Sequence, residues 1–317
     1  MNLFRRMVRF VLLVSGFVAG LSAVLAAMLA RFLLAPPRQK LWSDPGDVGL
    51  EFDDVTFPAR DGLRLSGWFV PGEGVAEGAR PTVVLVHGWT WNRLGDAADT
   101  LASHLSNSTS VDLLRLMHAL QQSGYNVFMF DMRNHGLSGD APPVTFGLTE
   151  AADLLGALDY VQGRPEAAGQ PIGVTAFSMG GNALLYALPQ TEAVTAAVAV
   201  QPTNMKLFFQ RYVHDVMGPL GKVILPVAEQ MYLLGGGVPW QDVDPLMAST
   251  RAGKTPILYV QGIGDQWGSL DNVARMVAST PKTAPPIYVQ TGHRANAYQH
   301  LVNNPDILIR YFRQHLG

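Results

Sequence analysis

The stretch Thr175-Ala176-Phe177-Ser178-Met179-Gly180-Gly181 lies where an apolar segment gives way to a helical pattern. Residues 171–177 predict a short buried strand, and residues 182–188 predict the start of a helix. A serine at such a turn is forced into a strained backbone conformation that lifts its hydroxyl clear of the sheet. The residues two before and two after it must then be very small, and here they are Ala176 and Gly180. The stretch therefore predicts a nucleophilic Ser178, although Ala176 departs by one methyl group from the usual glycine.

Strand and helix patterns alternate on both sides of this turn. Two alternating segments, 50–57 and 63–70, flank Arg60-Asp61-Gly62 and predict a β-hairpin. Continuous apolar runs then predict buried strands at 82–86, 126–130, 172–177, 194–200, 256–260 and 286–290. Segments with three-to-four apolar spacing predict helices at 111–122, 149–162, 182–188, 270–278 and 305–316. This order predicts an α/β fold in which helices flank a mostly parallel sheet that begins with an antiparallel pair.

The composition is that of an ordinary globular protein with room for a large core. Of its 317 residues 48% are hydrophobic and 15% are charged, and the formal net charge is -2. No basic run occurs beyond the N-terminus, which argues against a nucleic-acid partner. The absence of cysteine excludes disulfides, thiolate metal sites and a cysteine nucleophile.

Residues 1–40 differ from the rest and are predicted to form a membrane anchor and linker. Phe10 to Ala30 carries no charge and would measure about 31 Å as a helix, which matches the hydrocarbon thickness of a bilayer. Val24-Leu25-Ala26 offers a cleavage site, so a signal peptide is the alternative. The apolar run continues past that site and favours an uncleaved single-pass anchor. The short, Arg-rich N-terminus is hard to translocate, which favours a catalytic domain outside the cytoplasm.

The chain from about residue 50 to 317 resembles the α/β-hydrolases. Three motifs carry the resemblance in the family's order, and each follows a predicted strand: Val86-His87-Gly88-Trp89, the segment 130–139 with its Asn134-His135-Gly136, and the serine turn. The resemblance implies an α/β-hydrolase fold for residues 41–317, with a helical cap inserted at about 202–254. It also implies a catalytic triad in the chain order Ser, Asp or Glu, His.

The resemblance assigns the other triad members to later strand ends. Gly262-Ile263-Gly264-Asp265 matches the family's Gly-x-x-Asp, so Asp265 is expected to be the acid, with Asp271 as the rival. Gly292-His293 follows the last strand and is expected to supply the base. The other histidines are in helical or cap patterns, or in turn motifs where the family uses them structurally: His87, His104, His118, His135, His214, His300 and His315.

These residue types predict acyl transfer. His293 would take the proton of Ser178 as the serine attacks a carbonyl carbon, while Asp265 fixes the imidazole tautomer. The resemblance implies that the backbone N–H groups of Met179 and Trp89 bind the developing oxyanion. Such a reaction requires no metal and no dissociable cofactor.

The cap segment gives the only hint of substrate. It is rich in large apolar residues, which fit either a cap that buries its own core or an acyl-binding pocket with Gly235-Gly236-Gly237 as hinge. Together with an anchor, the pocket reading favours a small-molecule ester or thioester of a lipid-like acid. Two alternatives remain open: a serine aminopeptidase-like enzyme using cap carboxylates, and a non-catalytic membrane-tethered binding protein.

Overall fold

A computed structural model describes residues 2–74 and 79–317. Its main sheet has eight strands in the order β1-β2-β6-β3-β7-β8-β9-β10. The strands β1 and β2 form the antiparallel pair and β2 runs antiparallel to β6, whereas all other neighbours are parallel. The strands are β1 (Asp53–Pro58), β2 (Arg64–Val70), β3 (Thr82–Val86), β6 (Asn126–Asp131), β7 (Ile172–Phe177), β8 (Val194–Val200), β9 (Ile257–Gly262) and β10 (Ile287–Val289). A separate two-stranded sheet pairs β4 (Gly95–Asp96) with β5 (Val111–Asp112).

Two apolar layers enclose the sheet because its central strands are buried on both faces. In β7, Val174 and Ala176 pack into one layer and Phe177 into the other. The first layer includes α4 (Glu150–Gln162), α5 (Met179–Ala187) and α9 (Leu270–Ser279), and the second includes α3 (Leu113–Gln122), α10 (Arg294–Asn303) and α11 (Asp306–Leu316). Short helices α2 (Leu101–Leu105) and α8 (Leu246–Ser249) lie in connecting segments. The predicted α/β-hydrolase architecture is confirmed.

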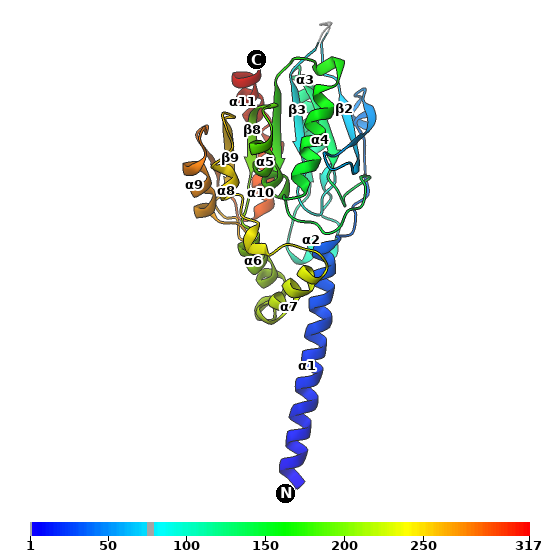
Figure 1. The fold of residues 1–317 in the computed structure, drawn as a ribbon, viewed down its shortest axis with the longest axis vertical. Coiled ribbons are helices and arrows are strands. Elements are labelled where there is room, and N and C mark those ends of the chain that lie inside the picture. The colour runs from blue at the N-terminus through cyan, green and yellow to red at the C-terminus, as the bar shows by residue number, and fades with distance from the viewer. Residues whose placement is uncertain (1, 75–78) are drawn as a thin grey trace.

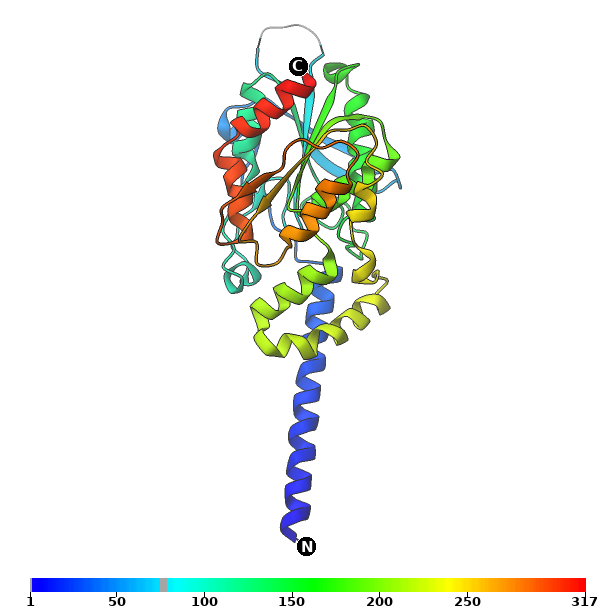
Figure 2. The same ribbon diagram turned by 90° about the vertical axis from the view of Figure 1, so that its left-hand side faces the viewer.

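The cap consists mainly of α6 (Met205–Met217) and α7 (Gly221–Leu234). Both lie at the end of the domain from which α1 (Asn2–Leu34) projects (Figures 1 and 2). A short 3-10 turn, Gly218–Leu220, joins α6 to α7. The expected cap range 202–254 thus contains two longer helices, α6 and α7, which pack against each other, followed by a 3-10 turn at Trp240–Asp242 and the short helix α8.

The helix α1 is not a detached rod along its whole length. Its last turns pack against α7, and Ala26, Ala30 and Leu33 are buried in the first apolar layer. The described side chains from Phe4 to Val24 are exposed apart from Ser22. The helix is long and apolar enough to cross a membrane, by length and composition.

Several element boundaries differ from the sequence-based expectation. The segment predicted as a helix from residue 111 begins with β5, and Asp112 caps the shorter α3 by accepting from the N–H groups of Leu114 and Arg115. The sequence analysis did not predict α10, which begins directly after His293. That start matters for the site described next.

Candidate active site

Ser178 occupies a strained turn between β7 and α5, as predicted. Its backbone has φ +54° and ψ −114°, outside the regions that non-glycine residues ordinarily adopt. A Cβ on Gly180 would lie 2.5 Å from the carbonyl oxygen of His87, so no larger residue fits there. Ala176 is buried between Val86 and Ala199 in the neighbouring strands, and its methyl group packs in the apolar core.

The loop after β3 approaches Ser178 closely. A Cβ on Gly88 would lie 3.4 Å from Ser178 Cβ. His87 fixes this loop: its Nε2 accepts from the Met132 N–H at 2.9 Å, so its Nδ1–H donates to the Gly88 carbonyl at 2.7 Å. Burial lowers the pKa of His87, which keeps this imidazole neutral. Within the described residues, the backbone N–H groups of Trp89 and Met179 form no hydrogen bond, so both are available to an oxyanion.

Asp265 lies at the end of β9, where it was expected, and its carboxylate is saturated with donors. Oδ1 accepts from the backbone N–H groups of Trp267 and Gly268, and Oδ2 accepts from Gln261 and from Arg294 Nη1 at 2.5 Å. The rival Asp271 is on α9 and pairs with Arg275 at the surface. Asp265 is therefore held in place close to the serine turn. Its charged partner, however, is an arginine and not the expected histidine.

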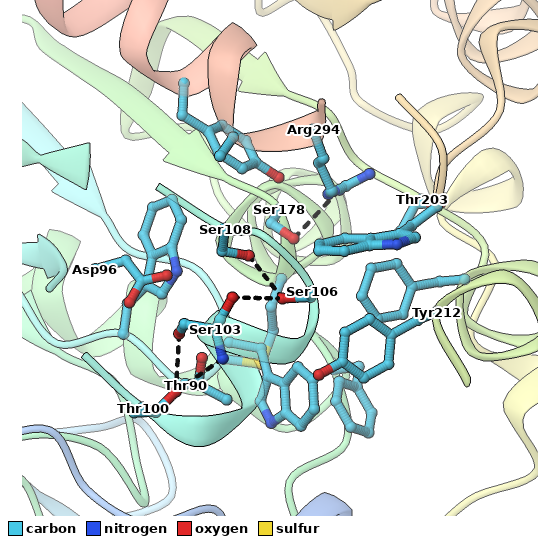
Figure 3. A pocket seen from close by; sticks show the side chains of 18 of the residues that line it. Thr90, Asp96, Thr100, Ser103, Ser106, Ser108, Ser178, Thr203, Tyr212 and Arg294 are labelled. Carbon is cyan, nitrogen blue, oxygen red and sulfur yellow. Dashed lines mark hydrogen bonds between the residues drawn. The ribbon is translucent and has the colours of Figure 1, made fainter. Parts of the chain in front are cut away.

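Arg294 bridges the acid and the serine. Its Nη2 donates to Ser178 Oγ at 3.3 Å (Figure 3). The same nitrogen also donates to the Gln201 carbonyl. Burial opposes the guanidinium charge, but Asp265 and Tyr298 outweigh it and raise the pKa of Arg294. The guanidinium also lies over the rings of Phe208 and Tyr298. This cation fills the space in which a triad would place its imidazole.

His293 does not meet Ser178 or Asp265 in this arrangement. Its Nδ1 accepts from the Ala295 N–H at 3.1 Å, which caps α10, so its Nε2–H donates to the Ser106 carbonyl at 2.8 Å. A triad base needs the opposite tautomer, with Nδ1–H facing the acid and Nε2 facing the serine. The structure thus joins Ser178 to Asp265 through Arg294 and leaves His293 nearby but turned away.

One aromatic residue connects this region to the cap. Trp267 packs edge-on against the His293 ring at 5.0 Å and against Tyr212 of α6 at 5.1 Å. Its Nε1–H donates to Asp215 of α6 at 3.0 Å, and Arg211 of α6 donates to the Gly268 carbonyl. The position of α6 and the loop that carries Asp265 are therefore mechanically coupled.

A small cavity of about 80 Å³ is lined in part by Ser178. One side is aromatic: Phe32, Trp89, Phe146, Phe208, Tyr212 and Trp267. The other side carries hydroxyl groups of Thr90, Thr100, Ser103, Ser106 and Ser108 (Figure 3). Ligand pockets commonly measure about 300–1,000 Å³, so an ester substrate requires this cavity to widen.

Sequence reasoning missed two contributors to the site. Phe32 belongs to α1, yet its ring packs against Trp89 at 5.0 Å and lines the cavity. Arg294 adjoins His293 in sequence, but no sequence pattern indicates that its side chain is buried against Asp265. Among the described residues, no three His, Asp or Glu side chains are grouped so that they could share a metal ion.

The fold and this serine turn define an α/β-hydrolase. Residues 83–309 match the alpha/beta hydrolase family, which is most of the 317-residue chain, and the chain belongs to that family. It is 28% identical over 241 residues to the uncharacterized protein YfhR of Salmonella typhimurium, covering 68% of this chain and 76% of that one. It is 23% identical over 267 residues to the alpha/beta hydrolase domain-containing protein WAV2 of Arabidopsis thaliana, covering 79% and 75%.

Solved structures share the fold at lower identity. An esterase of Pyrococcus furiosus superposes with a TM-score of 0.68 at 23% identity, covering 89% of this chain and all of that one. An acylaminoacyl peptidase of Pyrococcus horikoshii superposes with a TM-score of 0.60 at 18% identity, covering 84% of this chain and 42% of that one. The chain is thus a hydrolase-family protein whose structural neighbours cleave more than one kind of bond.

Proposed function

We propose that the protein is a serine hydrolase that cleaves carboxylic esters through an acyl-enzyme. The observation that carries the proposal is Ser178 itself, held at φ +54°, while the backbone N–H groups of Trp89 and Met179 form no hydrogen bond in the part of the chain that the structure describes. A strained backbone of this kind costs about 1–3 kcal/mol and persists where function requires it. In this proposal Ser178 is the nucleophile, His293 the base and Asp265 its partner.

The chemistry follows from these roles. His293 Nε2 removes the Ser178 proton while Oγ bonds to the carbonyl carbon of the ester, and the carbonyl oxygen becomes an oxyanion bound by Trp89 and Met179. The tetrahedral intermediate collapses as His293 returns the proton to the leaving alkoxide, which departs as an alcohol. Water then repeats the sequence on the acyl-enzyme and releases the acid.

The described arrangement is then a closed resting state. Support comes from the small cavity and from Arg294, which occupies the place of the imidazole between Asp265 and Ser178. An arginine cannot serve as the base, because its guanidinium stays protonated. The active state requires Arg294 to leave Ser178 and His293 to turn toward Asp265.

The cavity favours an amphiphilic substrate. Its aromatic side suits the acyl chain of an ester, and its hydroxyl-bearing side suits a polar alcohol moiety. Thr203 Oγ1 and Trp89 Nε1 are buried without a hydrogen-bond partner among the described residues, so polar groups of a substrate have places to bind. We therefore favour a lipid-like ester or acyl thioester.

An aminopeptidase-like activity finds less support. Three of the four cap carboxylates that it would use are engaged elsewhere: Asp215 accepts from Trp267, Glu229 from the Trp240 N–H and Asp244 from Asn204. The fourth, Asp242, is exposed. None of them lines the cavity. A substrate ammonium group bound in this cavity would therefore contact no cap carboxylate.

The test is hydrolysis of p-nitrophenyl esters from acetyl to palmitoyl by the full chain in detergent micelles. Ser178→Ala and His293→Gln should each lower kcat/KM by about a thousandfold or more. The melting temperature should be unchanged in Ser178→Ala, whereas His293→Gln should unfold cooperatively at a somewhat lower temperature, because it loses the cap of α10. His300→Gln, on the outer part of α10, is the matched control and should retain activity.

Three results would change the proposal. Full activity of Ser178→Ala would show that Ser178 is not the nucleophile, whereas absence of turnover in the unmodified protein would leave the binding-protein alternative. Full activity of His293→Gln would remove the base while keeping the serine. Activity confined to the shortest esters would keep the mechanism and exclude the lipid-like substrate.

A further inference from the structure

The outer face of α7 is apolar and uncovered. Leu220, Val223, Val227 and Leu234 are 43%, 58%, 39% and 89% exposed. Their spacing of three, four and seven residues places them on one side of the helix, opposite the buried Ile224, Ala228 and Tyr232. A stripe of this kind at one end of a protein indicates an interaction surface.

The position of α1 indicates what covers this stripe. The charge-free segment Phe10 to Ala30 would span about 31 Å, which is the thickness of a bilayer core. Among its last six residues, Leu25, Ala26, Leu29 and Ala30 join the first apolar layer, and α1 packs against α7. These six residues measure about 9 Å along the axis of α1. A bilayer that covers the whole charge-free segment therefore reaches the level of α7.

The charges on this end of the molecule fit the same placement. The exposed residues of α7 are Lys222, Val223, Pro226, Val227, Gln230 and Leu234, and none is a carboxylate. Lys222 lies in the first turn of α7, and the exposed Arg31 follows the charge-free segment of α1. Basic groups at this level would face lipid phosphates, while the apolar stripe enters the acyl boundary.

We propose that the outer face of α7 docks into the surface of the bilayer that α1 crosses, so that the cavity over Ser178 opens toward lipid. This inference rests on the proposed function for the identity of the substrate, which would be an ester resident in the bilayer. Phe32 of α1 and Tyr212 of α6 form part of the cavity wall, and both of these helices pack against α7.

The first experiment measures depth in the full chain, reconstituted into phosphatidylcholine–phosphatidylglycerol vesicles. The protein contains no cysteine, so Val227→Cys can carry a single environment-sensitive fluorophore. Lipids with a doxyl group near the headgroup end of the acyl chain should quench it by about twofold or more. The control is Glu192→Cys, exposed before β8 at the other end of the sheet, which should not be quenched.

The second experiment separates docking from catalysis. The pair Val223→Asp and Val227→Asp should lower hydrolysis of a vesicle-resident long-chain ester by about tenfold, with hydrolysis of soluble p-nitrophenyl acetate unchanged. The pair Val223→Leu and Val227→Leu should retain both activities.

Equal quenching at positions 227 and 192 would overturn the docking proposal, even if Ser178-dependent cleavage of the soluble ester is intact. Quenching at 227 without any hydrolysis would instead keep the docking surface and defeat the proposed function. Efficient disulfide-linked dimer formation by Val227→Cys would show that a second copy covers the stripe and would also overturn it.

Discussion

At the scale of residues, two neighbours compete for one acid. Asp265 is buried, and a charged guanidinium compensates its charge better than a neutral imidazole does. His293 gains its own hydrogen bonds instead, as the cap of α10 and as donor to Ser106. The exchange of these two side chains is the step that the proposed catalytic cycle requires.

Stability should decrease in mild acid because of His135. Burial first, and then the neighbouring His87, lowers the pKa of His135 from 6.5 to about 3. Between these values the unfolded chain binds a proton that the folded chain does not, so stability falls as pH decreases from 6.5 toward 3. The slope for one such group is at most about 1.4 kcal/mol per pH unit.

Melting temperatures at pH 7.5, 6 and 5 measure this effect. His135→Gln should lose less stability than the unmodified protein between pH 6.5 and 5, since other titrating groups are common to both. His214→Gln, at an exposed position of α6, should follow the unmodified protein. Parallel curves for His135→Gln and the unmodified protein would contradict the prediction.

The sequence predicted those site features that local chain geometry decides. The strained Ser178 follows from the small residues around it, and Asp265 follows from its place at a strand end. The orientation of His293 could not be predicted, because it depends on whether Arg294 or His293 binds the carboxylate of Asp265. That competition involves β9, β10 and α10 at once and leaves no pattern in the chain.

At the scale of elements, α1 has an exposed N-terminal part and a C-terminal part that packs against the hydrolase domain. Its final turns present Ser22, Ala26 and Ala30 at four-residue spacing, and such small side chains allow α7 to approach closely. Gly235 at the end of α7 serves the same contact, since a Cβ there would lie 2.5 Å from Leu34 Cδ1. The glycine run, expected as a hinge, thus has a packing role at this position.

Leu33→Ala should therefore destabilise the hydrolase domain. The Leu33 side chain is fully buried, and its truncation should reduce the free energy of unfolding by about 2–5 kcal/mol. Met28→Ala is the control, because Met28 is 64% exposed on the same helix. Thermal unfolding followed by tryptophan fluorescence in micelles compares the two, and equal melting temperatures would show that α1 is not part of the folded domain.

The sequence analysis treated α1 as separate from the domain. Length and hydropathy predict whether a helix can span a membrane, but they do not show whether one of its faces packs against other helices. The spacing of Leu25, Ala26, Leu29, Ala30 and Leu33 does mark a helical face, but a uniformly apolar segment hides it. By contrast, β8 was predicted with its observed bounds, since its run of mostly apolar residues begins at Val194 and ends before the polar Gln201.

At the scale of the whole molecule, the sheet sets the direction of everything else. Ser178, Asp265, His293 and Trp89 all follow the carboxyl ends of parallel strands, so the cap and α1 meet at that edge. One end of the molecule therefore combines the candidate site, the cap and the apolar helix (Figure 1). A chain anchored through α1 would hold its site against the membrane surface.

This geometry leaves the side of the membrane open to experiment, and charge favours one answer. Arg5, Arg6 and Arg9 precede the charge-free segment in a short tail, whereas Arg31, Arg38 and Lys40 lead into a long domain. Short basic segments resist translocation, but long domains cross largely regardless of charge. We expect the N-terminus inside and the hydrolase domain outside the cytoplasm.

Membrane-impermeant maleimide applied to intact cells tests this expectation. Glu192→Cys should react without permeabilisation, whereas Asn2→Cys should react only after it. The intact mass of the purified protein is the control for cleavage, since removal of residues 1–26 would detach the domain from its anchor and release it. Labelling of Asn2→Cys alone in intact cells would reverse the orientation, and the bilayer-facing site would then draw its substrate from the inner leaflet.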